Sequence, residues 1–131
     1  MKHHAECSCG QLTVTTNVEP AGVSVCHCYA CQRRSGSAFA LQAWFPIGEV
    51  EIAGESKEYL RTADSGNQHP FYFCPNCGST VYYQLGDQPD VIAVAVGAFA
   101  DKDFPPPTRS VYHTSSGHGW IEIPEHIERR G

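Results

Sequence analysis

The chain has 131 residues and a mass of 14.3 kDa, and its 9 Lys and Arg against 14 Asp and Glu give a formal net charge of −5. That length suits one compact domain with a hydrophobic core, and the acidic balance argues against a nucleic-acid partner. No apolar run approaches the roughly 20 residues that span a bilayer, and no apolar stretch follows Met1 as it would in a secretory signal, so we expect neither membrane insertion nor export.

Most of the chain is typical of short β-strands, because β-branched and aromatic residues alternate with polar ones between turns rich in glycine and proline. We expect strands at 12–16, 38–45, 50–52, 71–73, 80–83, 91–96 and 120–123. The run at 91–96 is the longest apolar stretch and predicts a buried central strand. No window shows twelve residues of apolar 3.6-residue periodicity, so we expect no long helix and only one helical turn, at 29–35.

Three consecutive prolines at 105–107 predict an extended connection, after which the chain has room for only a last pair of strands. The fold class is therefore all-β, in a single small domain of short antiparallel strands. Exposed sheet edges in such a fold favour a monomer or a homodimer.

Cysteine is the most informative residue. There are seven, an odd number, so disulfides alone cannot pair them all. They fall into three short clusters: Cys7 and Cys9; Cys26, Cys28 and Cys31; Cys74 and Cys77. With no export signal we expect a reducing, cytoplasmic location, where thiolates bind metal rather than form structural disulfides.

The segment Cys74-Pro75-Asn76-Cys77-Gly78 is the most diagnostic of the three clusters. In a tight turn two such thiolates bind one ion, and the glycine tolerates the positive φ that the turn needs. A redox pair of the thioredoxin type opens a helix after a strand. Here strands are expected on both sides, so the motif lies in a hairpin turn and favours half of a zinc site.

The count of ligands divides the cysteines into two sites. A closed structural zinc needs four ligands, and the two clusters of two cysteines supply Cys7, Cys9, Cys74 and Cys77. The remaining cluster, Cys26, Cys28 and Cys31, gives three ligands and leaves one zinc position open, as in catalytic sites. We expect the first site to hold the fold together and the second to carry the chemistry.

The same residues resemble a known family. Its motifs are a Cys-x-Cys near the N-terminus, a Cys-His-Cys-x-x-Cys-x-Arg and a Phe-Cys-x-x-Cys-Gly, which stand here at 7–9, 26–33 and 73–78. The segments 31–39 and 94–101 and the position of Trp120 are also similar. Together they resemble the glutathione-dependent formaldehyde-activating (GFA) enzymes, also called the centromere protein V family.

The resemblance implies a small β-tent fold held together by zinc, with the domain at residues 3–126 and the same division of the cysteines into four and three. It also implies carbon–sulfur lyase activity, in which glutathione and formaldehyde join to give S-hydroxymethylglutathione. Zinc would be the cofactor, at one structural and one labile catalytic site. A small-molecule thiol and an aldehyde would be the partners.

Thiol addition to a carbonyl needs a thiolate, and an open zinc position supplies one at neutral pH. Glutathione carries two carboxylates, so Arg33 and Arg34, which follow Cys31, are expected to include a substrate-binding residue. His27 is a candidate proton donor by proximity, with a solvent or backbone hydrogen bond as its alternative.

Two other functions remain open from the sequence. A non-catalytic zinc-binding module of the same fold would keep all seven cysteines as metal ligands. A methionine-sulfoxide reductase would need a nucleophilic cysteine outside the metal sites, typically late in the chain, and no cysteine follows Cys77.

Overall fold

A computed structural model describes residues 2–111 and 113–130 of the chain. The strands of the first half are β1 (His3–Glu6), β2 (Thr13–Thr16), β3 (Gly22–Cys26), β4 (Ala40–Pro46) and β5 (Val50–Ala53). Those of the second half are β6 (Lys57–Thr62), β7 (Gln68–Phe73), β8 (Thr80–Leu85), β9 (Gln88–Ala95), β10 (Arg109–Val111) and β11 (Glu128–Arg130). The α-helix is α1 (Tyr29–Ser35), and 3₁₀ turns lie at Ile47–Glu49, Val96–Phe99 and Thr114–Ser116. No helix in these ranges is long and apolar enough to cross a membrane.

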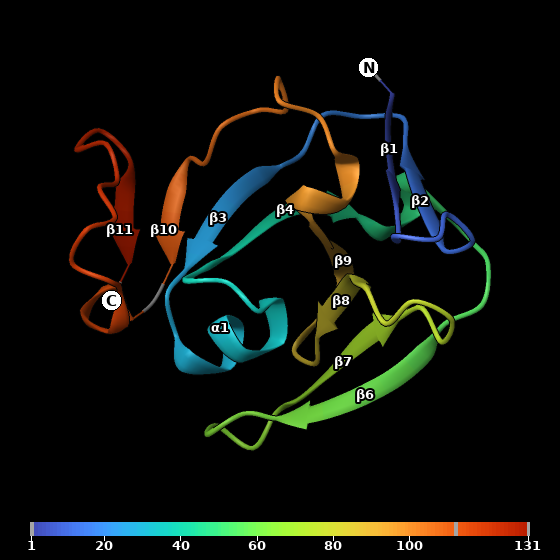
Figure 1. The fold of residues 1–131 in the computed structure, drawn as a ribbon, viewed down its shortest axis with the longest axis horizontal. Coiled ribbons are helices and arrows are strands. Elements are labelled where there is room, and N and C mark those ends of the chain that lie inside the picture. Colours follow the sequence, from blue (N-terminus) through green and yellow to red (C-terminus); the bar gives the residue numbers. More distant parts are fainter. Residues whose placement is uncertain (1, 112, 131) are drawn as a thin grey trace.

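The strands form two sheets (Figure 1). The smaller sheet has the order β1-β2-β5, and the larger has the order β11-β10-β3-β4-β9-β8-β7-β6. Neighbours are antiparallel except for β10, which runs parallel to both β3 and β11. The architecture therefore confirms the all-β class and a mainly antiparallel topology.

The hydrophobic core lies between the smaller sheet and one face of the larger sheet. Because side chains alternate along a strand, Ile92 and Val94 of β9 both point into this core, and Val14 of β2 packs into it from the smaller sheet. Phe45 of β4 is fully buried between them, and Phe99 packs against it at 6.2 Å between ring centroids. Burying a side chain of this size is worth about 1.5–3 kcal/mol, so this face stabilises the fold.

The opposite face of the larger sheet carries different residues. The register aligns Cys26 of β3 with Ala40 of β4, and Trp44 of β4 with Ala93 of β9, which places all four side chains on this second face. Helix α1 covers part of it, because Cys31 packs with Cys26 and Ala40 in a separate cluster. One face of the larger sheet thus forms the main core, and the second cysteine cluster lies on the opposite face.

The structure confirms most of the predicted elements. The helical turn at 29–35 coincides with α1, and 91–96 falls almost wholly within β9, a central strand with Ile92, Ala93 and Val94 fully buried. The last pair of strands is present as β10 and β11, joined in parallel rather than as a hairpin.

The strand predicted at 120–123 is wrong. This segment is a turn followed by extended chain without a sheet partner among the described residues, and the Trp120 side chain is 74% exposed. A hydrogen bond from the Ile121 N–H to the His118 carbonyl, 3.1 Å long, turns the chain here, and Pro124 has no N–H to donate to a neighbouring strand.

Three strands, β1, β3 and β6, were not predicted, because their residues are mostly polar, small or exposed. β1 is polar at three of its four positions, β3 contains a glycine and a serine, and β6 is an edge strand exposed at every position except Arg61. Charged, exposed residues are typical of an edge strand and give little sequence signal.

Candidate metal centres

The loop between β1 and β2 presents the first two cysteines. The Cys7 N–H donates to the Leu12 carbonyl at 2.9 Å, and the Gly10 N–H donates to the Cys7 carbonyl at 3.0 Å, which closes a tight loop. Gly10 has φ +82°, a left-handed conformation that glycine adopts without strain. The Leu12 N–H also donates to the Cys7 sulfur at 3.3 Å, as expected for a thiolate ligand held by backbone donors.

The hairpin turn between β7 and β8 presents the other two. The Cys74 N–H donates to the Ser79 carbonyl at 3.0 Å, and the Gly78 N–H donates to the Cys74 carbonyl at 2.8 Å. Gly78 has φ +81°, and the Asn76 N–H donates to the Cys74 sulfur at 3.3 Å. The predicted hairpin turn is thus confirmed, and it has the same backbone pattern as the first loop.

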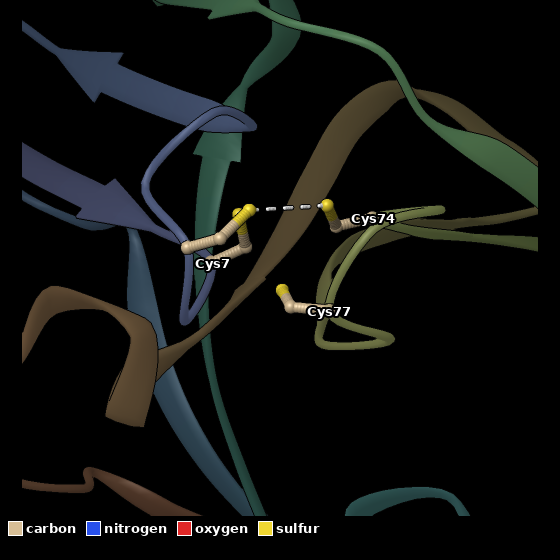
Figure 2. Close-up of side chains that lie close together, drawn as sticks. Cys7, Cys74 and Cys77 are labelled. Atoms are coloured by element: carbon tan, nitrogen blue, oxygen red, sulfur yellow. Dashed lines mark hydrogen bonds between the residues drawn. The ribbon is translucent and has the colours of Figure 1, made fainter.

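The sulfurs of the two loops converge across the gap between them (Figure 2). All four Sγ atoms, of Cys7, Cys9, Cys74 and Cys77, lie within 4.8 Å of one another. Two of the separations are 3.6 Å (Cys7 to Cys9) and 3.7 Å (Cys9 to Cys74). A tetrahedron with a zinc–sulfur bond of about 2.3 Å has edges of about 3.8 Å, whereas a disulfide needs about 2.05 Å. The four sulfurs therefore fit one zinc ion and no disulfide.

Groups around this first centre favour a thiolate at Cys74 and at Cys77. Burial raises the pKa of the Cys74 thiol, but the Gln11 side-chain amide, which donates to its sulfur at 3.0 Å, and nearby backbone N–H groups bring that pKa below its ordinary value. The hydrogen bond between the Cys77 sulfur and the Ser79 hydroxyl lowers the pKa of Cys77 to about 5. Gln11 also donates to the Glu55 carbonyl at 2.7 Å and accepts from its N–H at 2.9 Å. These two hydrogen bonds connect the loop of the first centre to Glu55, which lies between β5 and β6.

The second cluster is local. Cys26 ends β3, Cys28 is the N-cap of α1, and Cys31 lies in the first turn of that helix. The Cys31 N–H donates to the Cys28 sulfur at 3.3 Å, which is a capping hydrogen bond made by a thiol in place of the usual oxygen. The three Sγ atoms lie within 4.8 Å of one another. The structure therefore forms the two groups of four and three that the sequence predicts, and their zinc content stays a prediction.

The three thiols do not share their protons equally. The hydrogen bond with Cys26 lowers the pKa of Cys31 to about 5, against the effect of burial, and the nearby Arg34 guanidinium lowers it further. The same hydrogen bond and burial raise the pKa of Cys26. In the metal-free protein the hydrogen bond between Cys26 and Cys31 therefore favours a thiolate on Cys31.

The two arginines after Cys31 point in different directions. Arg33 is exposed to solvent. Arg34 folds back over the sheet, with its guanidinium carbon 5.0 Å from the Phe71 ring centroid and 4.9 Å from that of Tyr83. Stacking of this kind holds a guanidinium in place at little cost in hydration. Arg34 is therefore a fixed positive charge beside the second cluster, whereas Arg33 is a surface cation.

His27, the candidate proton donor, does not face open solvent. Its side chain is only 4% exposed, burial lowers its pKa, and its Nδ1 has no hydrogen-bond partner within residues 2–111 and 113–130. A Cβ atom added to Gly117 would lie 3.2 Å from this nitrogen, so the 114–119 loop packs directly on the imidazole. The imidazole therefore packs against Phe39 and this loop, and it lines a cavity of about 260 Å³ together with the loop.

Sequence reasoning missed two glutamines that organise the centres. Gln11 bonds Cys74, as described above, and the Gln32 side-chain amide donates to the carbonyls of His27 at 2.8 Å and Ser116 at 3.2 Å. Both residues lie one or two positions after a cysteine, which is the only local signal that could have drawn attention to them.

Comparison with known proteins agrees with this arrangement. The sequence model of the glutathione-dependent formaldehyde-activating enzyme family matches residues 2–115. A comparison with curated proteins gives no match. Among solved structures, a crystal structure of a Rhodobacter sphaeroides protein is similar with a TM-score of 0.56 and 23% sequence identity, over 81% of this chain and 92% of that one. That similarity concerns the fold, whereas the family match covers most of the chain and both cysteine groups. The chain therefore belongs to the glutathione-dependent formaldehyde-activating enzyme family.

Proposed function

We propose that this protein is a zinc-dependent carbon–sulfur lyase that adds a thiol, glutathione, to formaldehyde and so forms S-hydroxymethylglutathione. One observation supports this most strongly. Cys26, Cys28 and Cys31 bring three sulfurs within 4.8 Å of one another on the sheet face that does not form the main core. Three sulfurs leave a zinc coordination position for a substrate.

The residues present fit zinc at both centres, because thiolate sulfur is a ligand type that zinc prefers and the sulfurs of each group lie within 4.8 Å of one another. At the first centre two of the separations also match tetrahedral edges. Cys7, Cys9, Cys74 and Cys77 would hold the structural ion, and Cys26, Cys28 and Cys31 the second one. When bound at the second centre, zinc supplies a site where an incoming thiol is held as its thiolate at neutral pH.

The protein's own residues prepare the charge at this centre. Three thiolates concentrate negative charge, and Arg34 offsets part of it from its stacked position over Phe71 and Tyr83. In the reaction, the substrate sulfur forms a bond to the aldehyde carbon, the carbonyl π pair moves to oxygen, and that oxygen takes up one proton. The thiol gives up one proton on binding, so the overall addition neither consumes nor releases protons.

Three further expectations belong to this proposal. Residues 3–126 make up the working domain, a reducing compartment such as the cytoplasm keeps the seven cysteines available, and the protein acts as a monomer or homodimer.

The decisive experiment follows formaldehyde consumption with glutathione, using zinc-loaded protein beside an uncatalysed blank. The test variant replaces Cys26, Cys28 and Cys31 with serine, and the matched control replaces the exposed Lys102 with glutamine. We expect the wild type and the control to exceed the blank and the triple variant to equal it. If the wild type equals the blank, the proposed function is wrong and the protein is a zinc-binding module. If the triple variant stays active, the reaction takes place elsewhere.

A further inference from the structure

A cavity of about 280 Å³ lies on the same sheet face as the second cysteine cluster. Trp44 and Val91 form part of an apolar wall, Ser24 lies on its floor, and Arg109 and Arg130 border it. The Trp44 indole N–H donates to the Ser24 hydroxyl at 3.2 Å, so the wall and the floor are fixed to each other. None of these residues takes part in either metal centre.

The sheet register places this cavity next to Cys26. Arg109 of β10 pairs with Ser24 of β3, two residues before Cys26 on the same face. Arg130 of β11 pairs with the β10 residue that also pairs with Cys26. Two strand spacings therefore separate the backbones of Cys26 and Arg130, a distance of about 10 Å. An extended cysteinyl-glycine segment spans about 7 Å, and an arginine side chain covers the remainder.

The charge of the cavity favours an anion. Glu128 lies 3.8 Å from the Arg109 guanidinium and 3.2 Å from that of Arg130, so two cations already share one carboxylate. The group keeps one net positive charge in a chain whose formal charge is −5. A guanidinium binds a carboxylate through paired N–H donors, which makes these two arginines suited to a second carboxylate.

A buried polar atom with no partner lies between the cavity and the cluster. Gln42 is opposite Ser24 in the register and is only 3% exposed. Its side-chain oxygen has no hydrogen-bond partner in the part of the chain that the structure describes. Buried oxygens are normally satisfied, but this one does not line the cavity, so the polar contacts available to a ligand there come from Arg109 and Arg130.

We infer that this cavity binds the carboxylate end of the thiol substrate and makes the protein selective for anionic, peptide-like thiols over neutral ones. The inference rests on the proposed function, because it takes the second cluster as the place where the sulfur binds. Arg109 and Arg130 bind the carboxylate, and the wall formed by Trp44 packs against the substrate backbone. Substrate choice then depends on residues far along the chain from the cysteines.

Binding is tested without the reaction by using S-methylglutathione, which has both carboxylates but no free thiol. Trp44 reports it by fluorescence once Trp120 is replaced by phenylalanine, which leaves one tryptophan in the chain. Loss of one charge-assisted contact is worth about ten-fold in affinity. We expect Arg109→Gln and Arg130→Gln to weaken binding about ten-fold each, Glu128→Gln to strengthen it, and the exposed control Lys102→Gln to leave it unchanged. Equal binding by all four variants, or no binding by the wild type, overturns the inference.

The reaction gives a second and separate readout. Arg130→Gln should raise KM for glutathione about ten-fold with kcat nearly unchanged, and leave KM for the neutral thiol 2-mercaptoethanol as it is. An equal rise for both thiols shows a general structural defect and overturns the inference. If S-methylglutathione binds as predicted but the wild type does not accelerate the addition, the proposed function fails while the cavity assignment stands.

Discussion

The two cysteine sites should contribute unequally to stability, because they close chain loops of very different length. Cys7 and Cys77 are 70 positions apart (77 − 7), whereas Cys26 and Cys31 are 5 apart (31 − 26). The entropy of closing a loop grows as 3/2 RT times the logarithm of its length, so the fourteen-fold ratio corresponds to about 2 kcal/mol. Cys77→Ser should therefore lower the free energy of unfolding by about 2 kcal/mol more than Cys28→Ser does.

These two positions make a matched pair, since Cys77 is exposed and Cys28 half-buried, so serine leaves no large cavity at either. The assay is urea unfolding followed by circular dichroism, in reducing buffer with excess zinc and then with a chelator. The difference should disappear in chelator, because neither site then cross-links the chain. An equal loss in both variants with zinc present, or a difference that persists in chelator, would refute the reasoning.

Three further outcomes are expected. Gly54→Ala should lower the free energy of unfolding by more than about 1 kcal/mol, because Gly54 has φ +97° and an added Cβ would overlap a backbone carbonyl of the first metal loop. The control Gly48→Ala, which has open space around the added Cβ, should lower it less. Equal midpoints of the two variants in thermal melts would contradict this. Arg34→Met should raise the pKa of Cys31 in the metal-free protein from about 5 toward its ordinary value. The measurement is the pH profile of alkylation by iodoacetamide, which should shift to higher pH. An unchanged profile would show that the arginine has no effect on the thiol. Burial and a nearby cation lower the pKa of His69, whose Nδ1 accepts a backbone N–H at 2.9 Å. The unfolded state therefore takes up a proton first, and stability should fall as the pH drops below about 6.5, the ordinary pKa of histidine. His69→Asn should flatten that dependence in urea titrations, and an unchanged slope would assign the dependence to other groups.

The division of the cysteines was predictable because it depends on spacing within short motifs. Cys74 and Cys77 lie in a turn whose glycine and flanking aromatic strands are visible in the sequence, and the structure places them there. The α1 turn was predictable for the same reason, since its cap and first turn are set by neighbouring residues. Both turns are determined by residues within the same short segment, which is why the sequence predicts them.

Other features depend on contacts between distant segments and left no local signal. The alternation at 120–123 indicates a strand, yet no partner strand pairs with it in the described ranges. Alternation by itself was therefore not enough to predict a strand here. Arg33 and Arg34 are equivalent in the sequence, and only the positions of Phe71 and Tyr83 on two other strands decide which of them turns inward. The cavity beside Trp44 likewise needs β10 to pair with β3 and β11 to pair with β10.

The separate roles of the two centres are tested most directly by zinc content per chain, measured by elemental analysis on folded, reduced protein. We predict about two zinc ions per wild-type chain, and about one in the variant with Cys26, Cys28 and Cys31 replaced by serine, whose thermal melt should stay close to that of the wild type. A triple variant that keeps two ions, or that unfolds as a Cys77 variant is expected to, would contradict the assignment of one structural and one functional centre.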